Sequence, residues 1–243
     1  MAQRTAQHIP GHVLSAFQLD SRAGIPVGPE WDNGVRFGRV VVSEASDTAA
    51  WSGKARDHAG EFGAGIAVSR PVRATDGRLV VGGFKASEFV EGRVLARIDE
   101  AVSAALRYDE AMAGVDAPTA DRGDAFATAE RAVWRDYIPQ PGDVVAHMDF
   151  ASCLLFSGDT VPTLTDLVPS SSKRPRGFTA ALVIVDGLLA QACNVAVLDR
   201  WAHVPGLREL AGYALEYRVA CARAAGSDIR SIAEGIDQAL VSE

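Results

Sequence analysis

The chain has 243 residues, which is enough for one large domain or for two lobes with a sizeable core. Hydrophobic residues make up 48% of it and the formal net charge is −7, so the composition is that of a globular protein and argues against nucleic acid or an anionic membrane as its main partner. The three cysteines, Cys153, Cys193 and Cys221, show no Cys-x-x-Cys spacing, which fits a reducing compartment and offers no zinc site.

Residues 1–91 predict a small antiparallel sheet with one helix. The pair Asn33-Gly34 stands ahead of alternating residues, a pattern typical of a β-hairpin. We expect further strands at 40–43, 67–72 and 78–83, the last two joined by a turn at 74–77, and a helix at 46–57.

Residues 92–243 predict a helical region that is interrupted by one short hairpin. We expect helices at 98–112, 124–137, 178–191, 195–202, 206–225 and 228–241. The fold class is therefore α+β, with a sheet-rich lobe followed by a helical one.

Two segments bear on the location of the protein. Met1–Pro10 is polar and lacks the apolar core of a signal peptide. Phe178–Leu198 is apolar over almost the length of a membrane span, but Asp186 and Asn194 interrupt it, so we expect a buried helix that breaks near 192–194. These features predict a cytoplasmic protein without a membrane partner.

The hairpin lies within His147–Leu167. Cys153–Phe156 suits a buried strand, a Ser-Gly-Asp turn follows, and Val161–Leu167 suits the returning strand. Asp149 precedes the first strand and Asp166 ends the second, so the hairpin is expected to bring both carboxylates to the same end. Phosphoryl transfer uses such a pair, in which one acid orients the attacking hydroxyl and the other holds Mg²⁺.

This stretch resembles the catalytic core of the protein-kinase-like phosphotransferases, in particular the aminoglycoside phosphotransferase branch. More narrowly, it is similar to an actinobacterial family that shows His-x-Asp-Leu-x-Gly-Asn-Val-Leu-Phe and then Ile-Asp-Leu-Thr-Pro. That family also shows Arg-Pro-Val-Arg-x-x-Asp-Gly-Arg, as found here at Arg70–Arg78, before a strand-to-hinge passage like Gly82–Gly92. The resemblance implies a two-lobed kinase-like fold, with a small antiparallel-sheet N-lobe and a helical C-lobe.

The resemblance also implies roles for three residues of the hairpin. Asp149 stands at the catalytic-base position and Asp166 at the metal position, with ATP and Mg²⁺ as cofactors. Cys153 stands where the family has an Asn that binds the metal, and a thiol is a poor ligand for so hard a cation.

The nucleotide side of the resemblance is weaker. The third strand of a kinase carries a phosphate-binding Lys, and here that strand leads to Ser43. We expect Lys54 in the following helix and Lys85 near the hinge, away from this position. Arg36 or Arg39 in the first hairpin are alternative sources of the missing charge.

Two further residues are expected to support the hairpin. His147 is expected to pack beneath its loop and to bond backbone groups. Asp186 lies on an apolar helix, where an unpartnered carboxylate is costly, so we expect it to accept hydrogen bonds from backbone N–H groups of residues 147–150.

Three functions follow from these patterns. The preferred one is a kinase-like protein with a degenerate nucleotide site, a pseudoenzyme that acts as a binding or regulatory module for a small molecule or a protein. The alternative is an active ATP-dependent small-molecule phosphotransferase with Asp149 as base and Asp166 as Mg²⁺ ligand. A weaker third is a thiol enzyme with Cys153 as nucleophile and His147 as its base, although burial would raise the pKa of that thiol.

Overall fold

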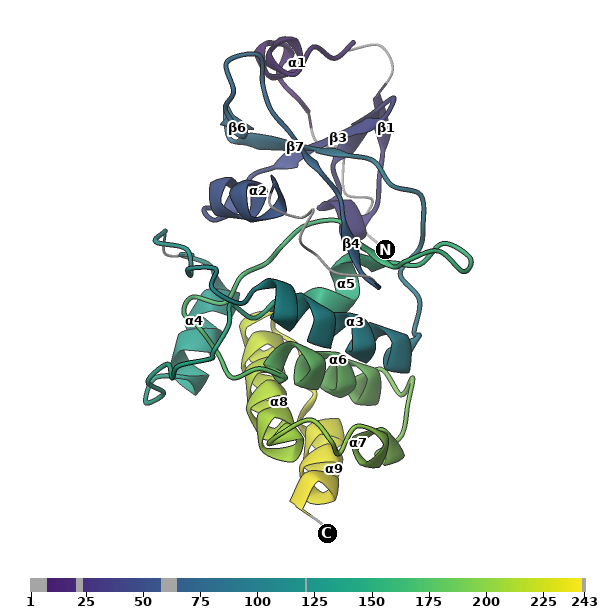
Figure 1. Ribbon diagram of the computed structural model, residues 1–243, viewed down its shortest axis with the longest axis vertical. Helices are drawn as coiled ribbons and strands as arrows, with labels where there is room; N and C mark the ends of the chain where they lie inside the picture. The colour runs from purple at the N-terminus through teal and green to yellow at the C-terminus, as the bar shows by residue number, and fades with distance from the viewer. Residues whose placement is uncertain (1–7, 21–23, 58–64, 121, 242–243) are drawn as a thin grey trace. The chain divides into compact units, whose positions relative to one another are not determined.

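The structure of the chain, a computed structural model, describes residues 8–20, 24–57, 65–120 and 122–241, so most of the polar segment Met1–Pro10 lies outside it (Figure 1). The chain divides into two compact units. The first comprises Met1–Leu95 and Ser152–Leu167, and the second comprises Ala96–Ala151 and Val168–Glu243. Each unit is described by itself below.

The first unit holds the strands. Its elements in chain order are α1 (Gly11–Ala16), β1 (Gly24–Pro26), the 3₁₀ turn η2 (Pro29–Trp31), β2 (Val35–Phe37), β3 (Val40–Glu44), α2 (Ala49–Asp57), β4 (Ala67–Val68), β5 (Pro71–Val72), β6 (Val80–Val81), β7 (Phe84–Glu88), β8 (Leu154–Leu155) and β9 (Thr163–Leu164). The main sheet has the order β1-β2-β3-β7-β5, with β6 also paired to β7, and every pair in it is antiparallel.

The two faces of this sheet differ in chemistry. Side chains alternate between the faces of a strand, and Val42 lies opposite Ala86 in the β3–β7 pair. Both are buried in an apolar cluster that also contains Val13 and Leu14 of α1. The neighbouring pairs, Val41 with Ser87 and Ser43 with Lys85, therefore project to the opposite face. Figure 1 shows α1 and α2 on opposite sides of the sheet, so the mixed polar face is the one beside α2.

The predicted hairpin between 67–72 and 78–83 does not form. Instead β5 and β6 both pair with β7, a strand within Gly82–Gly92, the segment that resembles a strand-to-hinge passage. Gly82 and Gly83 join β6 to β7 with positive φ values of 57° and 81°, as a two-residue hairpin turn requires. These glycines were expected at the end of the strand 78–83, whereas they form a turn between β6 and β7.

The hairpin predicted after Cys153 does form, in a shorter version. Cys153 ends α5 (Phe150–Cys153), and β8 and β9 pair antiparallel. β9 also pairs in parallel with β4. Because of this second pairing, residues 152–167 pack with the first unit, whereas the sequence analysis had assigned the whole hairpin to residues 92–243.

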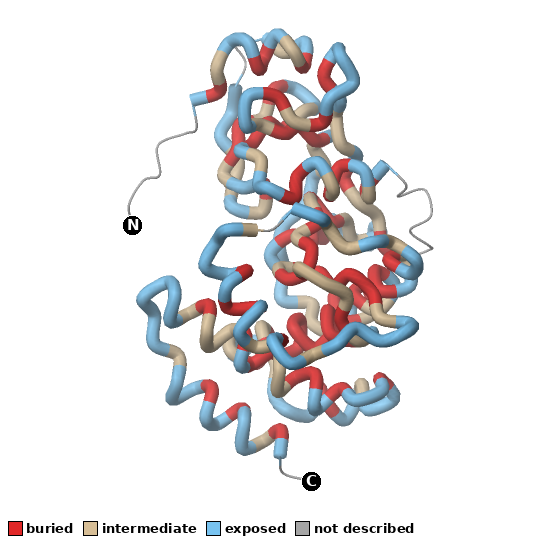
Figure 2. Tube along the Cα trace, turned by 90° about the vertical axis from the view of Figure 1, so that its left-hand side faces the viewer, coloured by how far each residue is buried: buried red, intermediate tan, exposed pale blue. Residues whose placement is uncertain are grey.

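The second unit is helical. Its elements besides the start of α5 are α3 (Ile98–Ala111), α4 (Ala125–Val133), α6 (Phe178–Leu189), α7 (Ala196–Arg200), α8 (Leu207–Ala224) and α9 (Arg230–Val241). α6 packs between α3 and α8, and nearly all of its residues are buried, as the apolar sequence predicts. The helix at the C-terminal end of the chain shows buried positions along one side only (Figure 2).

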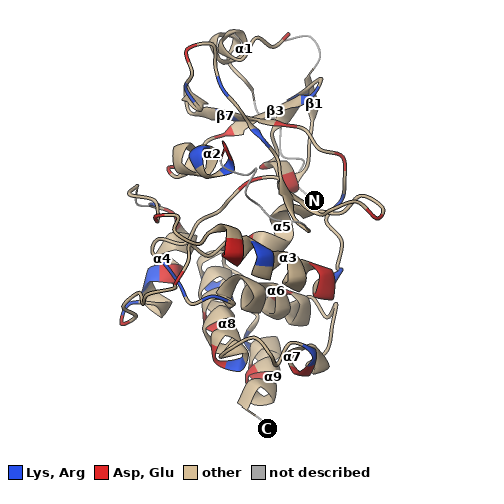
Figure 3. Cartoon of the chain, in the orientation of Figure 1, with Lys and Arg blue, Asp and Glu red and all other residues tan. Residues whose placement is uncertain are grey.

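Two expectations about the helices are confirmed. The long apolar segment breaks between α6 and α7, where the chain forms turns at 190–195. Within the described ranges, each helix falls short of the length or the apolar character that a bilayer crossing needs. Acidic and basic side chains are interspersed along both units (Figure 3).

Candidate functional site

Asp166 is the centre of a closed polar cluster in the first unit. Its Oδ1 accepts hydrogen bonds from the Ser52 hydroxyl at 2.5 Å and from the Leu167 backbone N–H at 2.8 Å, and lies 3.5 Å from Nη2 of Arg56. Its Oδ2 contacts the ammonium of Lys85. Both carboxylate oxygens therefore already have donors.

Lys85 places a buried cation beside Asp166. It lies in β7 directly opposite Ser43, and its side chain is buried on the mixed polar face of the sheet. Its ammonium contacts Asp166 and also lies 2.8 Å from Oδ2 of Asp32. A kinase carries a lysine on its third strand, whereas Lys85 lies on the strand that pairs with β3.

The charges of this cluster stabilise one another. Burial by itself lowers the pKa of Lys85, but the attraction of Asp166 and Asp32 outweighs it and raises that pKa above its ordinary value. Burial likewise raises the pKa of Asp166, but Lys85 and then Arg56 outweigh it and hold that pKa well below its usual range. The cluster therefore consists of ions at neutral pH.

Arg56 ties the cluster to the surrounding backbone. This buried side chain of α2 donates from Nη1 to the carbonyl oxygens of Ser69 and Thr165 and to the Ser87 hydroxyl, at 3.1–3.2 Å. These bonds join α2, β7 and the strand before Asp166. The Arg56 guanidinium therefore has a structural role, since its hydrogen bonds hold these segments together.

An apolar slot adjoins the polar cluster. Trp31 is 5% exposed and packs with Val41 and Leu155, and its ring centroid lies 5.5 Å from that of Phe89. The cavity left between this slot and Lys85 has a volume of about 10 Å³, which is roughly the space of one water molecule. Side chains of the first unit thus occupy nearly all of the space beside Lys85 and Asp166.

Asp149 has a more open setting in the second unit. It is half-buried, and its backbone N–H points to Nδ1 of His147 at 3.2 Å. The Val168 N–H points to Nε2 of the same ring at 3.3 Å, and a neutral imidazole can accept only one of these bonds at a time. His147 is fully buried, and its ring contacts those of Tyr108 and Phe150.

Asp186 was expected to accept hydrogen bonds from backbone N–H groups of residues 147–150, and this prediction is wrong because its partner is a side chain. Asp186 forms a two-pronged ion pair with Arg218 of α8, with both N–O distances 2.6 Å. The N–H of His147 bonds the Thr179 hydroxyl and that of Met148 bonds the Val168 carbonyl, so these groups do not use Asp186. Burial raises the pKa of Asp186 despite Arg218, and the charge of Asp149 adds to the rise.

A different carboxylate supports the loop before Asp149. Asp109 of α3 accepts hydrogen bonds from the Gly177 N–H at 2.7 Å and from the Thr179 hydroxyl at 3.0 Å. Thr179 in turn accepts the His147 N–H at 3.1 Å. Burial raises the pKa of Asp109 to about 7, so this support is sensitive to pH near neutrality.

The remaining predicted site residues lie elsewhere. Cys153 is buried, and its carbonyl accepts the Thr165 N–H at 2.9 Å. Arg36 stacks over the Phe89 ring at 3.7 Å and donates to the Gly38 carbonyl, while Arg39 is exposed. The cations that approach Asp166 are Lys85 and Arg56.

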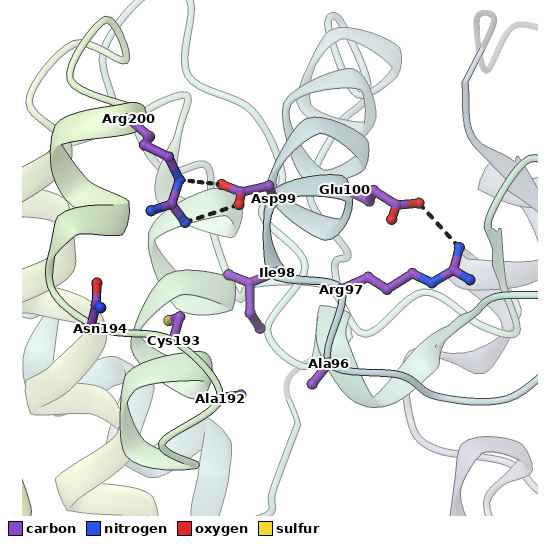
Figure 4. A pocket seen from close by; sticks show the side chains of 9 residues that line it. All are labelled: Ala96, Arg97, Ile98, Asp99, Glu100, Ala192, Cys193, Asn194 and Arg200. Atoms are coloured by element: carbon purple, nitrogen blue, oxygen red, sulfur yellow. Dashed lines mark hydrogen bonds and ion pairs between the residues drawn. The ribbon is translucent and has the colours of Figure 1, made fainter.

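A hollow of about 390 Å³ lies in the second unit, and its charged side chains pair with one another (Figure 4). Arg200 binds Asp99 through two hydrogen bonds of 3.1 and 2.9 Å, and Arg97 pairs with Glu100. Burial raises the pKa of Cys193, which keeps this thiol protonated and weakly nucleophilic. The hollow does not contain the residues of the predicted site.

The comparisons with known proteins agree with this architecture. No family model matches the sequence, and no curated protein is significantly similar to it. The structure is similar to a crystal structure of an aminoglycoside phosphotransferase from Alicyclobacillus acidocaldarius, with a TM-score of 0.61 and 15% sequence identity over 98% of this chain and 92% of the other. The chain has an aminoglycoside phosphotransferase-like fold. The predicted α+β, kinase-like class is thereby confirmed.

The fold raises the question of whether these residues fit Mg²⁺. Mg²⁺ requires several oxygen ligands in a near-octahedral arrangement. The oxygens of Asp166 already accept from Lys85, Ser52 and Leu167, and two buried cations stand beside them. Within the described ranges, three or more His, Cys, Asp or Glu side chains nowhere gather in a way that could hold a metal ion. As arranged, Asp166 does not fit a Mg²⁺ site of this phosphotransferase-like fold.

The most informative residues of the site were missed from sequence for an identifiable reason. Lys85 was expected near the hinge because the predicted strand 78–83 ended just before it. A Gly-Gly pair between Val80-Val81 and an alternating segment is itself a hairpin signal, which would have placed Lys85 in a strand. Arg56 and Trp31 carry no comparable signal, since a helical Arg and an apolar Trp are ordinary in any fold.

Proposed function

We propose that this chain is a kinase-like protein whose nucleotide site has degenerated, and that it acts in the cytoplasm as a binding or regulatory module rather than as an enzyme. The observation that carries the proposal is the pairing of Asp166, at the metal position, with Lys85 and Arg56. A carboxylate neutralised in this way has little electrostatic attraction left for Mg²⁺·ATP.

Two other features support it. Cys153 replaces the amide that should complete the metal site, and Trp31 fills the adjoining apolar slot. Removal of one preorganised charge-stabilising group typically lowers a rate by about 10²–10³, so several such losses leave little turnover. The sequence motifs at 70–78 and 147–167 further favour membership of the actinobacterial family named above. Its partner would be a small molecule or a protein, not nucleic acid or a membrane.

Titration calorimetry with ATP, with and without Mg²⁺, tests the proposal. We expect no saturable binding up to millimolar nucleotide and no change in the melting temperature. Saturable binding below millimolar ATP, with stabilisation by several degrees that depends on Mg²⁺, would show that the site still works.

One observation favours the alternative, an active ATP-dependent phosphotransferase. Lys85 places a buried ammonium beside Asp166, as a phosphate-binding lysine should be placed. In that case Asp149 is the base for a substrate hydroxyl, Asp166 binds Mg²⁺ after releasing its cations, and Asp149→Asn abolishes ATP consumption. Absence of ATP consumption by the unmodified protein with a broad panel of hydroxylated metabolites would count against it.

A further inference from the structure

The loop between β1 and β2 folds on itself. Its backbone hydrogen bonds run among residues 27–34, including Trp31 N–H to the Gly28 carbonyl and Val27 N–H to the Gly34 carbonyl, both at 3.0 Å. Asp32 and the next residue adopt left-handed conformations with φ of 54° and 53°, which Asp and Asn tolerate better than most residues. The loop is therefore a preformed element, and its side chains attach it to the sheet.

Trp31 is the apolar attachment. Its indole lies in the slot formed by Val41 of β3, Leu155 of β8 and Phe89 after β7. The tilt between the Trp31 and Phe89 rings is 32°, and the guanidinium of Arg36 lies 3.7 Å from the centre of the Phe89 ring. A flat aromatic ring is thus held between apolar side chains, as ligand pockets hold such rings.

Asp32 is the polar attachment, and it completes the charge balance. The Asp32 carboxylate is 53% exposed, yet it reaches the buried Lys85 ammonium at 2.8 Å. Without it, the buried cluster of Lys85, Arg56 and Asp166 carries one net positive charge. The Asp32 carboxylate thus balances this charge at the position beside Lys85 where a bound anion could also lie.

We propose that the loop Gly28–Gly34 acts as the chain's own ligand for this site, with Trp31 in place of a planar aromatic ring and Asp32 in place of a phosphate-like anion. The inference rests on the proposed function, because it states what closes the degenerate site. When the loop swings out, the exposed slot and Lys85 bind a ligand that joins an aromatic ring to an anion, which is the chemistry of a nucleotide, and Mg²⁺ is not needed.

Gly34 lies so close to β3 that no side chain fits between the loop and this strand. A Cβ at this position would lie 2.5 Å from the Val42 carbonyl oxygen and 2.9 Å from the Ser43 Cβ. The backbone itself, and not a flexible side chain, would have to yield. Gly34→Ala should therefore displace the loop from the sheet without changing Trp31 or Asp32.

The first experiment uses pyrophosphate as an anion probe in titration calorimetry. Asp32→Asn keeps a residue that tolerates the left-handed backbone and removes only the charge. We expect pyrophosphate to bind this variant at least about tenfold more tightly than the unmodified protein. Asp76→Asn is the matched control, because Asp76 is an exposed, Arg-paired acid of the same unit, and it should leave pyrophosphate binding unchanged.

The second experiment uses ADP without metal on the Trp31→Ala/Asp32→Asn variant. We expect ADP to bind this variant at least about tenfold more tightly than pyrophosphate does, because the vacated slot accepts the base. Gly34→Ala should gain ADP binding as well, and it serves in place of the double variant if that variant fails to fold by circular dichroism.

The outcomes separate the two proposals. If the unmodified protein binds Mg²⁺·ATP tightly, the proposed function is wrong whatever the variants do. If the unmodified protein binds no nucleotide and folded Asp32→Asn gains no pyrophosphate affinity over the Asp76→Asn control, the loop is a structural element only. In that case the inference about the loop is wrong, and the proposal of a degenerate nucleotide site is unaffected.

Discussion

Asp166 in the first unit and Asp149 in the second are carboxylates in opposite surroundings. Asp166 is enclosed by Lys85, Arg56 and Ser52, and its pKa is held below the ordinary range. Asp149 is half-buried, and its backbone N–H points to Nδ1 of His147. The comparison shows that one acid is held by cations of its own chain, whereas the other lies in a loop that is held by hydrogen bonds.

The physical reason lies in how each acid is held. Asp166 lies inside the packed unit, so its charge must be balanced by the chain itself in the absence of a ligand. The loop of Asp149 is built from buried bonds among His147, Thr179 and Asp109, which the fold needs whether or not a substrate binds. Four measurements can break or sharpen this contrast.

The largest effect is expected from Asp166→Ala. This change leaves the buried Lys85 and Arg56 without their shared anion, so the free energy of unfolding should fall by about 3–5 kcal/mol. Urea denaturation at pH 7 measures it. The control is Asp159→Ala in the exposed turn of the same hairpin, which should change stability by no more than about 0.5 kcal/mol. A loss below about 1 kcal/mol for Asp166→Ala would mean that the cluster is open to solvent.

The pH dependence of stability should have opposite signs for the two units. The pKa of Asp109 is raised to about 7, so its protonated form stabilises the fold below about pH 4, and this stability is lost as pH rises through about 7. The pKa of Asp166 is lowered, so its contribution is present above the ordinary Asp pKa and is lost only in stronger acid.

Asp109→Asn tests this assignment by removing one titration. Between pH 5 and pH 8 the unmodified protein should lose roughly 2–3 kcal/mol through Asp109, and the variant should show a correspondingly flatter profile in urea denaturation. Asp186, whose pKa is also raised, still titrates in the variant, so the stability of the variant should keep a smaller dependence on pH. Parallel profiles for the two proteins would refute a titrating Asp109.

A smaller effect is expected from Arg218→Met. The change leaves Asp186 without its two-pronged partner, so stability at pH 7 should fall by about 1–3 kcal/mol. Arg230→Met breaks the exposed pair with Asp228 in the same unit and should cost almost nothing. Equal effects of the two changes would show that the Asp186–Arg218 pair is as solvated as a surface pair.

The smallest effect is expected from Asp149→Asn. The side chain is half-buried, and the loop bonds near it come from backbone groups, so stability should change by no more than about 0.5 kcal/mol. Thermal unfolding measures the change. A loss above about 2 kcal/mol would make Asp149 a structural acid like Asp166 and would remove the contrast between them.

Much of the fold was predictable because periodicity and caps are local. The helices now seen as α3, α6 and α8 were placed within two residues at each end, and the break after α6 was expected from Asn194. The resemblance of residues 147–167 led to the correct fold class. Strand pairing was less predictable: Ala67-Val68 pairs with Thr163-Leu164, almost a hundred residues away, and no local pattern announces that pairing.

By itself, the sequence determined the α+β class, the helices of the second unit and the short hairpin after Cys153, because each follows from local patterns along the chain. Only the tertiary structure decided that Lys85 lies opposite Ser43, that Arg56 and Ser52 reach Asp166, and that Trp31 and Asp32 fold back onto the same face. Electrostatic pairing depends on distance in space, and the residues of this cluster are up to 134 positions apart in the chain.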